Sequence, residues 1–151
     1  MRHSQITDLI WCGGQIRALD WEKLYDEGVR IDLSLQEEAR DDFGTLNPFA
    51  ELWLPAKDWY MPTIAQLALA ARFIDMAVKL QQGIVVHCKH GIGRAPLTVA
   101  CYLVTQGLGT EQAIGFVRSH RPLVDPNAGQ VAVVREFERL YGQGRFAEVY
   151  G

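Results

Sequence analysis

The stretch Ile84–Arg94, which reads IVVHCKHGIGR, decides the fold that we expect for this chain. Its first three residues are branched and apolar, as in a strand that is buried inside a parallel sheet. A loop with two glycines follows, and a helical pattern then runs from Arg94 to Gln106 and stops before Gly107. A buried strand that turns through such a loop into a helix is typical of open α/β sheets, in which ligands bind at the carboxyl ends of the strands.

The rest of the chain continues this alternation of strands and helices. Further strands are predicted at Leu9–Trp11, Val29–Leu33 and Leu52–Leu54. Further helices are predicted at Asp20–Glu27 with Asp20 as N-cap, from the Thr63–Gln66 capping box to Gly83, at Thr110–His120 and at Ala128–Tyr141. We therefore expect an α/β fold with a central, mostly parallel sheet of about four to five strands flanked by helices. Residues 1–151 have the length of one domain.

Composition and charge narrow the class of protein. Hydrophobic residues make up 48% of the chain and charged residues 22%, which is typical of a folded globular domain. The net charge of −3 argues against a general nucleic-acid binder. No apolar run approaches the ~18–20 residues of a membrane span, no signal-peptide core is present, and the final residues AEVYG contain no prenylation cysteine. With three cysteines, too few for a complete disulfide framework, we expect a cytoplasmic protein with reduced thiols.

The glycine loop after the central strand has the features of an anion site. Gly91 and Gly93 allow successive backbone N–H groups to turn inward, and the following helix directs its positive end to the same point. Cys88 lies where this field is strongest, so we expect the pKa of its thiol to lie well below the ~8.5 of a free cysteine. Arg94 can hold two oxygens of a tetrahedral anion in its planar fork. A cysteine and an arginine in this arrangement suit attack on the phosphorus of a bound phosphate.

Two other interpretations of these residues explain less of the pattern. If Cys88 were only a small apolar residue of the core, nothing would account for the Gly-x-Gly-Arg sequence that follows it. His87, Cys88 and His90 are too close in sequence for one tetrahedral zinc site, and no second ligand pair accompanies them. We expect Cys12 and Cys101 to lie in the core, and we expect neither a metal nor an organic cofactor.

Two segments resemble those of a known enzyme family. His87–Arg94 resembles the signature loop of the cysteine-dependent protein tyrosine phosphatases, Cys-x5-Arg preceded by His. Arg121–Gly129, which reads RPLVDPNAG, is similar to the Arg-Pro-x-x-x-Pro-Asn-x-Gly segment of dual-specificity phosphatases, which packs beside the active-site loop. The resemblance implies a small dual-specificity phosphatase that hydrolyses a phosphorylated protein or a small phosphomonoester through a phosphocysteine intermediate.

The resemblance also implies the catalytic roles. Cys88 is the expected nucleophile, and Arg94 the residue that stabilises the phosphoryl oxygens. Asp58 lies on a loop between a predicted strand and a predicted helix, where the family carries its general acid. Asp41 and Asp42 remain rival candidates for this acid, in a more polar loop.

Binding and supporting roles follow in the same way. We expect the phosphate to be bound by the loop residues Lys89, His90, Gly91, Ile92, Gly93 and Arg94. His87 is expected to tune the thiolate from behind the loop. Asn127 is a candidate orienting residue and Gln130 a candidate for positioning water, with a helix cap and a surface residue as the alternatives.

The chain departs from the family after the signature arginine, where a Ser or Thr hydroxyl usually helps the cysteine to leave. Here Ala95 and Pro96 follow, and the Arg-Ala-Pro triplet is similar to that of phosphatases of regenerating liver. A second hypothesis is therefore a low-turnover protein that binds or regulates through its phosphate pocket. The basic residues Lys89 and His90 resemble those of relatives that act on inositol lipids or inositol phosphates, and they support an inositol phosphate phosphatase as a further alternative.

Overall fold

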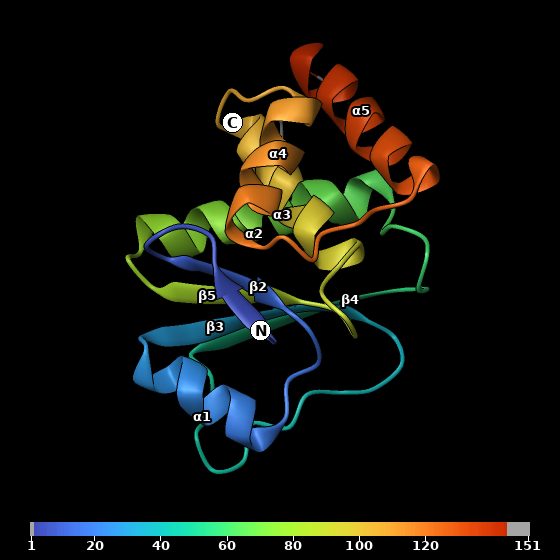
Figure 1. Cartoon of the computed structure of the whole chain (residues 1–151). Helices are drawn as coiled ribbons and strands as arrows, with labels where there is room; N and C mark the ends of the chain where they lie inside the picture. Colours follow the sequence, from blue (N-terminus) through green and yellow to red (C-terminus); the bar gives the residue numbers. More distant parts are fainter. Residues whose placement is uncertain (1, 145–151) are drawn as a thin grey trace.

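The computed structural model describes residues 2–144, in which a five-stranded sheet lies between two layers of helices (Figure 1). The strands are β1 (His3–Gln5), β2 (Ile10–Gly13), β3 (Val29–Gln36), β4 (Ala50–Ala56) and β5 (Gly83–His87). Their order in the sheet is β1-β2-β5-β3-β4, and only the pairing of β1 with β2 is antiparallel. The expected α/β fold with a mostly parallel sheet is confirmed. The final residues 147–151, expected to carry no lipid anchor, lie outside the described residues.

The helices divide unequally between the two faces of the sheet. They are α1 (Ala18–Asp26), α2 (Ile64–Lys79), α3 (Arg94–Thr105), α4 (Thr110–His120) and α5 (Ala128–Gly142). Figure 1 shows α1 alone on one face and the other four helices on the opposite face. No helix within residues 2–144 is long and apolar enough to cross a bilayer.

The central strand and helix form the middle of the core. β5 lies between β2 and β3, and all of its residues are buried. Burial on both faces explains why Ile84–Val86 form an unbroken apolar run rather than an alternating pattern. Eleven residues of α3, from Arg94 to Val104, are buried as well, because β5, α2, α4 and α5 surround this helix. Cys12 and Cys101 are fully buried members of the core, as expected.

Several boundaries differ from the predictions, for physical reasons. Asp20 is not the N-cap of α1; Arg17 is the cap residue, and the Asp20 carboxylate accepts a hydrogen bond from the Arg17 amide at 3.0 Å from the third position of the helix. β3 continues through polar Ser34 to Gln36 because both its neighbours hold it inside the sheet. The short strand β1 was not predicted, since three residues carry no clear periodicity.

Candidate active site

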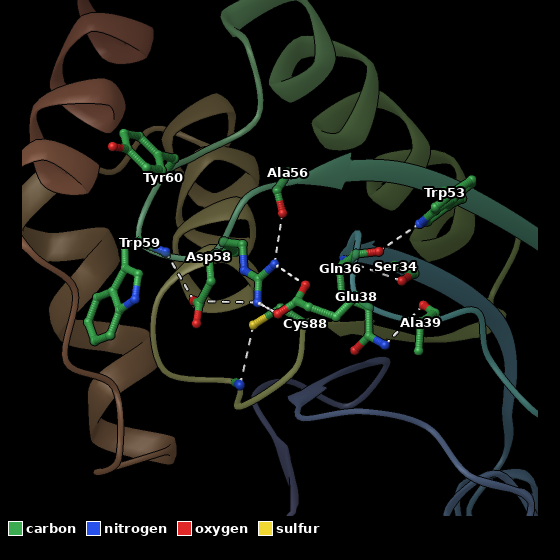
Figure 2. A network of polar contacts seen from close by, with 12 residues as sticks. Ser34, Gln36, Glu38, Ala39, Trp53, Ala56, Asp58, Trp59, Tyr60 and Cys88 are labelled. Carbon is green, nitrogen blue, oxygen red and sulfur yellow. Dashed lines mark hydrogen bonds and ion pairs between the residues drawn. The ribbon is translucent and has the colours of Figure 1, made fainter.

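The loop between β5 and α3 curls around the sulfur of Cys88, as Figure 2 shows. The amide of Gly91 donates a hydrogen bond to Cys88 Sγ at 3.3 Å. Gly91 has a positive φ of 69°, and a Cβ atom there would lie only 2.4 Å from the carbonyl carbon of Gly13. A glycine is therefore required twice, by the backbone conformation and by the close approach of β2. Cys88 is 2% exposed and lies at the carboxyl end of the central strand.

Arg94 opens α3 and is 1% exposed, although it carries a charge. Both terminal nitrogens of its fork contact the Glu38 carboxylate at 2.8 Å, and Nη1 also donates to the Ala56 carbonyl at 2.8 Å. These hydrogen bonds lower the pKa of Glu38 to about 2, so its carboxylate is ionised at neutral pH. Among the described residues the Arg94 Nε has no hydrogen-bond partner. Because both terminal nitrogens contact Glu38, the Nε edge is the part of the Arg94 fork that the described residues leave unused.

Asp58 lies on the loop between β4 and α2, which we call the acid loop and define as residues 57–62. One carboxylate oxygen lies 3.4 Å from Arg94 Nη2 and accepts a hydrogen bond from the Trp59 amide at 3.0 Å (Figure 2). The side chain is 41% exposed. The sequence placed Asp58 at this edge of the sheet, and the structure brings it to the predicted anion site, next to Arg94.

The rival acids occupy other positions. Asp41 is almost fully buried, and its carboxylate lies 2.8 Å from Nε2 of His87. Asp42 accepts a hydrogen bond from the Gly44 amide at 3.0 Å and so stabilises a turn. Among the described residues, Asp58 is the one of the three that contacts Arg94.

His87, directly before the nucleophile candidate, lies in a buried acidic setting. Its Nε2 is 3.1 Å from Asp32 on β3 and 2.8 Å from Asp41. Burial alone would lower the pKa of His87, but the charge of Asp32 and the hydrogen-bonded carboxylate of Asp41 outweigh it and raise the pKa to about 10. Burial raises the pKa of Asp32. The donor atoms of these three groups lie within 4.8 Å of one another, a spacing at which they could also hold a metal ion.

The Arg121–Gly129 segment packs against the loop between β5 and α3, as the resemblance implied. We call this loop, residues 88–93, the cysteine loop. The buried Arg121 donates to the carbonyls of Gly91 at 2.7 Å and His90 at 3.3 Å. The amide of Asp125 donates to the Ile92 carbonyl at 2.9 Å. These contacts hold the loop from outside, so that its carbonyls point away from Cys88 and its amides can point inward.

Asn127 and Gln130 form the N-terminal capping box of α5, and both amide side chains also reach the acid loop. Asn127 Nδ2 donates to the Trp59 carbonyl at 2.8 Å, and Gln130 Nε2 donates to the Tyr60 carbonyl at 3.0 Å. Gln130 is 4% exposed, so the alternative that it is a surface residue is wrong. The helix-cap alternative for Asn127 is confirmed.

Sequence reasoning assigned no role to Glu38, Asp32 or Arg121. Glu38 lies in a polar stretch without periodicity, and nothing in that stretch distinguishes it from Glu37. Arg121 is the first residue of the Arg121–Gly129 segment that resembles dual-specificity phosphatases, and this position could have indicated its role. Lys89 and His90 are exposed, and with Arg2, Gly14, Arg121 and Leu123 they line a cavity of about 410 Å³ beside the loop.

Comparison with known proteins finds a matching family model and several phosphatase relatives. The family model described as the catalytic domain of dual specificity phosphatases matches residues 10–140. A phosphatidylglycerophosphate phosphatase, PTPMT2 of Arabidopsis thaliana, is 38% identical over 91 residues, which cover 59% of this chain and 40% of that protein. The dual specificity protein phosphatase Mpk3 of Drosophila melanogaster is 27% identical over 147 residues, or 94% of this chain and 36% of that protein.

The fold has close counterparts among solved structures. The crystal structure of PTPMT1 in complex with PI(5)P superimposes with a TM-score of 0.84 at 24% identity, covering 96% of this chain and 99% of that one. The chain thus spans 36–40% of the length of the two curated relatives named above and nearly all of the solved domain.

Proposed function

The chain belongs to the dual-specificity phosphatase family, and on that premise we propose that it hydrolyses phosphomonoesters through a phosphocysteine formed at Cys88. The observation that carries the proposal is the loop from Cys88 to Arg94. Its sulfur is hydrogen bonded by the Gly91 amide, and its arginine is held beside Asp58. Nucleophile, anion-binding groups and acid thus lie at one end of the central strand.

In the first step, the Cys88 thiolate forms an S–P bond while the bond from phosphorus to the leaving oxygen breaks. Asp58, protonated, gives its proton to that oxygen, which departs as a neutral alcohol or phenol. The loop amides and the Nε edge of Arg94 stabilise the charge on the three equatorial oxygens. Glu38 holds the guanidinium in place through both terminal nitrogens, so that its orientation is set before the substrate arrives.

In the second step, the Asp58 carboxylate takes a proton from water, the water oxygen attacks phosphorus, and the S–P bond breaks. The thiolate leaves and inorganic phosphate is released. Ala95 offers no hydroxyl to stabilise the departing sulfur. The nearby Thr98 hydroxyl donates to the Arg94 carbonyl at 2.8 Å, so it is engaged elsewhere. This supports slower decay of the phosphoenzyme than its formation.

Pre-steady-state kinetics with excess 4-nitrophenyl phosphate test the function directly. We expect a burst of nitrophenol in proportion to enzyme, followed by slower release of phosphate, and a phosphoenzyme that can be trapped by acid quench. Cys88→Ser should show neither, because a serine hydroxyl is scarcely ionised and no base is dedicated to it. Full turnover by Cys88→Ser would contradict the assignment. Tight phosphate binding with no burst in the wild-type protein would instead support the low-turnover binding protein.

For the natural substrate, we propose a phosphomonoester with a second anionic group close to the scissile phosphate, as in a phospholipid headgroup. The exposed Lys89 and His90 line a basic cavity beside the loop, together with Arg2 and Arg121. The relative of Arabidopsis thaliana is named for phosphatidylglycerophosphate, whose headgroup carries a phosphodiester and a terminal phosphomonoester.

A substrate panel tests this choice. Phosphatidylglycerophosphate, inositol phosphates and a phosphotyrosine peptide would be compared by kcat/KM, with wild type and Lys89→Ala. We expect the lipid to be preferred, and we expect Lys89→Ala to lower that preference while the rate with 4-nitrophenyl phosphate changes little. Preference for the peptide in both proteins would point to a phosphoprotein substrate instead. The cytoplasmic location remains a proposal, and cell fractionation would test it.

A further inference from the structure

The start of α5 is bound to the acid loop from the side opposite Cys88. Two side-chain amides make this contact: Asn127 Nδ2 donates to the carbonyl of Trp59 at 2.8 Å, and Gln130 Nε2 donates to that of Tyr60 at 3.0 Å. In Figure 2, Asp58 points toward Cys88, whereas Trp59 and Tyr60 lie on its far side. The two hydrogen bonds therefore hold the backbone immediately after the acid.

Each of these amides uses its two ends differently. Asn127 Oδ1 accepts from the Gln130 backbone amide at 2.8 Å, and Gln130 Oε1 accepts from the Asn127 backbone amide at 3.1 Å. The oxygens thus cap α5, and the nitrogens reach the acid loop. A helix cap alone would be served equally well by Asp, Ser or Thr at position 127 and by Glu at position 130. Contact with the two carbonyls requires hydrogen-bond donors: ionised Asp and Glu have none, and a Ser or Thr hydroxyl sits one bond nearer the backbone than the Asn amide nitrogen.

The segment that these donors hold is in an unfavourable conformation. Trp59 has a φ of 72°, in the left-handed region that bulky residues avoid. Such a conformation persists only where surrounding contacts enforce it. The amide of this same residue donates to the Asp58 carboxylate at 3.0 Å. The carboxylate is thus anchored to a backbone segment that needs outside support to keep its shape.

Gln130 connects the acid loop with the cysteine loop as well. It is 4% exposed and packs directly over Gly93, where a Cβ atom would lie 2.8 Å from both of its side-chain polar atoms. Gly93 is the N-cap of α3, immediately before Arg94. One buried side-chain amide therefore contacts the end of the cysteine loop and donates a hydrogen bond to the acid loop. Both of its side-chain polar atoms are hydrogen bonded, so Gln130 is a structural link between the two loops.

We propose that Asn127 and Gln130 are positioning residues for Asp58. Their N–H donors hold the acid loop in the strained shape that directs the carboxylate to the leaving oxygen. The proposal rests on the proposed function, because it assigns these residues to the step in which Asp58 transfers a proton. Their loss should resemble a partial loss of Asp58 itself, with the nucleophile unaffected.

Matched variants separate this role from helix capping. Asn127→Ser and Asn127→Asp both keep an oxygen that can cap α5, and both lose the amide N–H that donates to Trp59: Asp has no donor, and the Ser hydroxyl is one bond shorter. One is neutral and one is charged, so agreement between them excludes an effect of charge alone. Gln130→Glu does the same at the second contact. We expect each to lower kcat/KM for an alkyl phosphate by about tenfold or more, but by less than about threefold for 4-nitrophenyl phosphate, whose leaving group needs little protonation.

A double-mutant cycle gives the decisive comparison. In the Asp58→Asn background, Asn127→Ser should cause no further loss with the alkyl phosphate, because the proton that it helps to place is gone. Equal losses with both substrates, or losses that multiply with that of Asp58→Asn, would overturn the proposal, as would an unchanged alkyl phosphate rate.

Hydrogen exchange provides a readout that does not depend on activity. Asn127→Ser should speed amide exchange in residues 57–62 and leave the middle of α5 protected. If the wild-type protein hydrolyses no phosphomonoester, the proposed function fails, whereas exchange still reports whether the contact holds the loop. Unchanged exchange in residues 57–62 would overturn the positioning role by itself.

Discussion

The cysteine loop and the acid loop face the same site but are held in place by different means. The shape of the cysteine loop follows from its own glycines and from the first residues of its helix, and Arg121 and Asp125 brace its backbone carbonyls from outside. The acid loop is partly exposed; its strained residue, Trp59, is held by a side chain of α5, and Arg94 contacts Asp58 beside it. Much of the nucleophile's position is thus set by residues next to it in sequence, whereas the acid is positioned by side chains from distant segments.

The largest effect on activity is expected when the turn at Gly91 in the cysteine loop is disrupted. Gly91→Ala places a Cβ atom against Gly13 at a positive φ, so the loop must open to accommodate it. We expect burst formation to fall at least about 10³-fold, which corresponds to about 4 kcal/mol, because both amide alignment and the approach of Cys88 depend on this turn.

Gly28→Ala is the matched control for that variant. Gly28 also has a positive φ, of 102°, but no atom lies within 4 Å of its Cβ position. Gly28→Ala should lower the free energy of unfolding by about 1 kcal/mol, measured by denaturant titration, and leave the burst intact. Equal loss of activity in both variants would mean that strain alone, and not the packing of the loop, sets the activity.

The acid loop should show a smaller and more selective effect. Asp58→Asn is expected to lower kcat/KM for alkyl phosphates by ~10²-fold, the usual scale for a general acid, and to lower it less for aryl phosphates. The pH profile should also lose its limb on the alkaline side of kcat/KM, since the protonated acid is no longer required. A profile identical to that of wild type would return the role to another carboxylate.

A gain of about tenfold is expected at the end of the cysteine loop. Ala95 is fully buried at the start of α3, and Ala95→Ser would offer a hydroxyl to the departing sulfur. A hydrogen bond to a charged group contributes roughly 1.5–3 kcal/mol, so phosphoenzyme decay should accelerate about tenfold while burst formation stays the same. Rapid quench measures both steps. If neither step changes, the missing hydroxyl does not limit turnover.

The last effect is on stability rather than on catalysis, at the base of the cysteine loop. The pKa of His87 is raised to about 10 in the folded protein by Asp32 and Asp41, against ~6.5 for an unperturbed histidine. The folded state therefore holds this proton more tightly than the unfolded chain. The resulting stability is fully present below about pH 6.5 and is lost as the pH rises through the folded pKa.

Urea titrations between pH 7 and 10 check this. The free energy of unfolding of wild type should fall with pH, by at most about 1.4 kcal/mol per unit from this one group. His87→Asn should be less stable at pH 7 and should show a shallower slope. Parallel slopes for the two proteins would show that His87 keeps an ordinary pKa.

The same division between the two loops explains which features could be predicted. The order of strands and helices from β2 onward, the capping box of α2 and the position of Cys88 and Arg94 were correct, since each depends on periodicity or on residues close in sequence. Asp58 was placed by its position after a strand. The boundary of α1 was wrong because a carboxylate at the third position of a helix resembles an N-cap in sequence.

By itself, the sequence determined the α/β architecture and the anion-binding loop, because a buried strand, two glycines and a helix start are local features with local causes. Only the tertiary structure decided that Glu38 would hold Arg94, that Asp32 and Asp41 would enclose His87, and that two amides of α5 would hold the acid loop. Each of those contacts joins segments separated by tens of residues. Such pairs become neighbours only when the sheet order and the helix packing bring them together, and no periodicity within either segment records the partner.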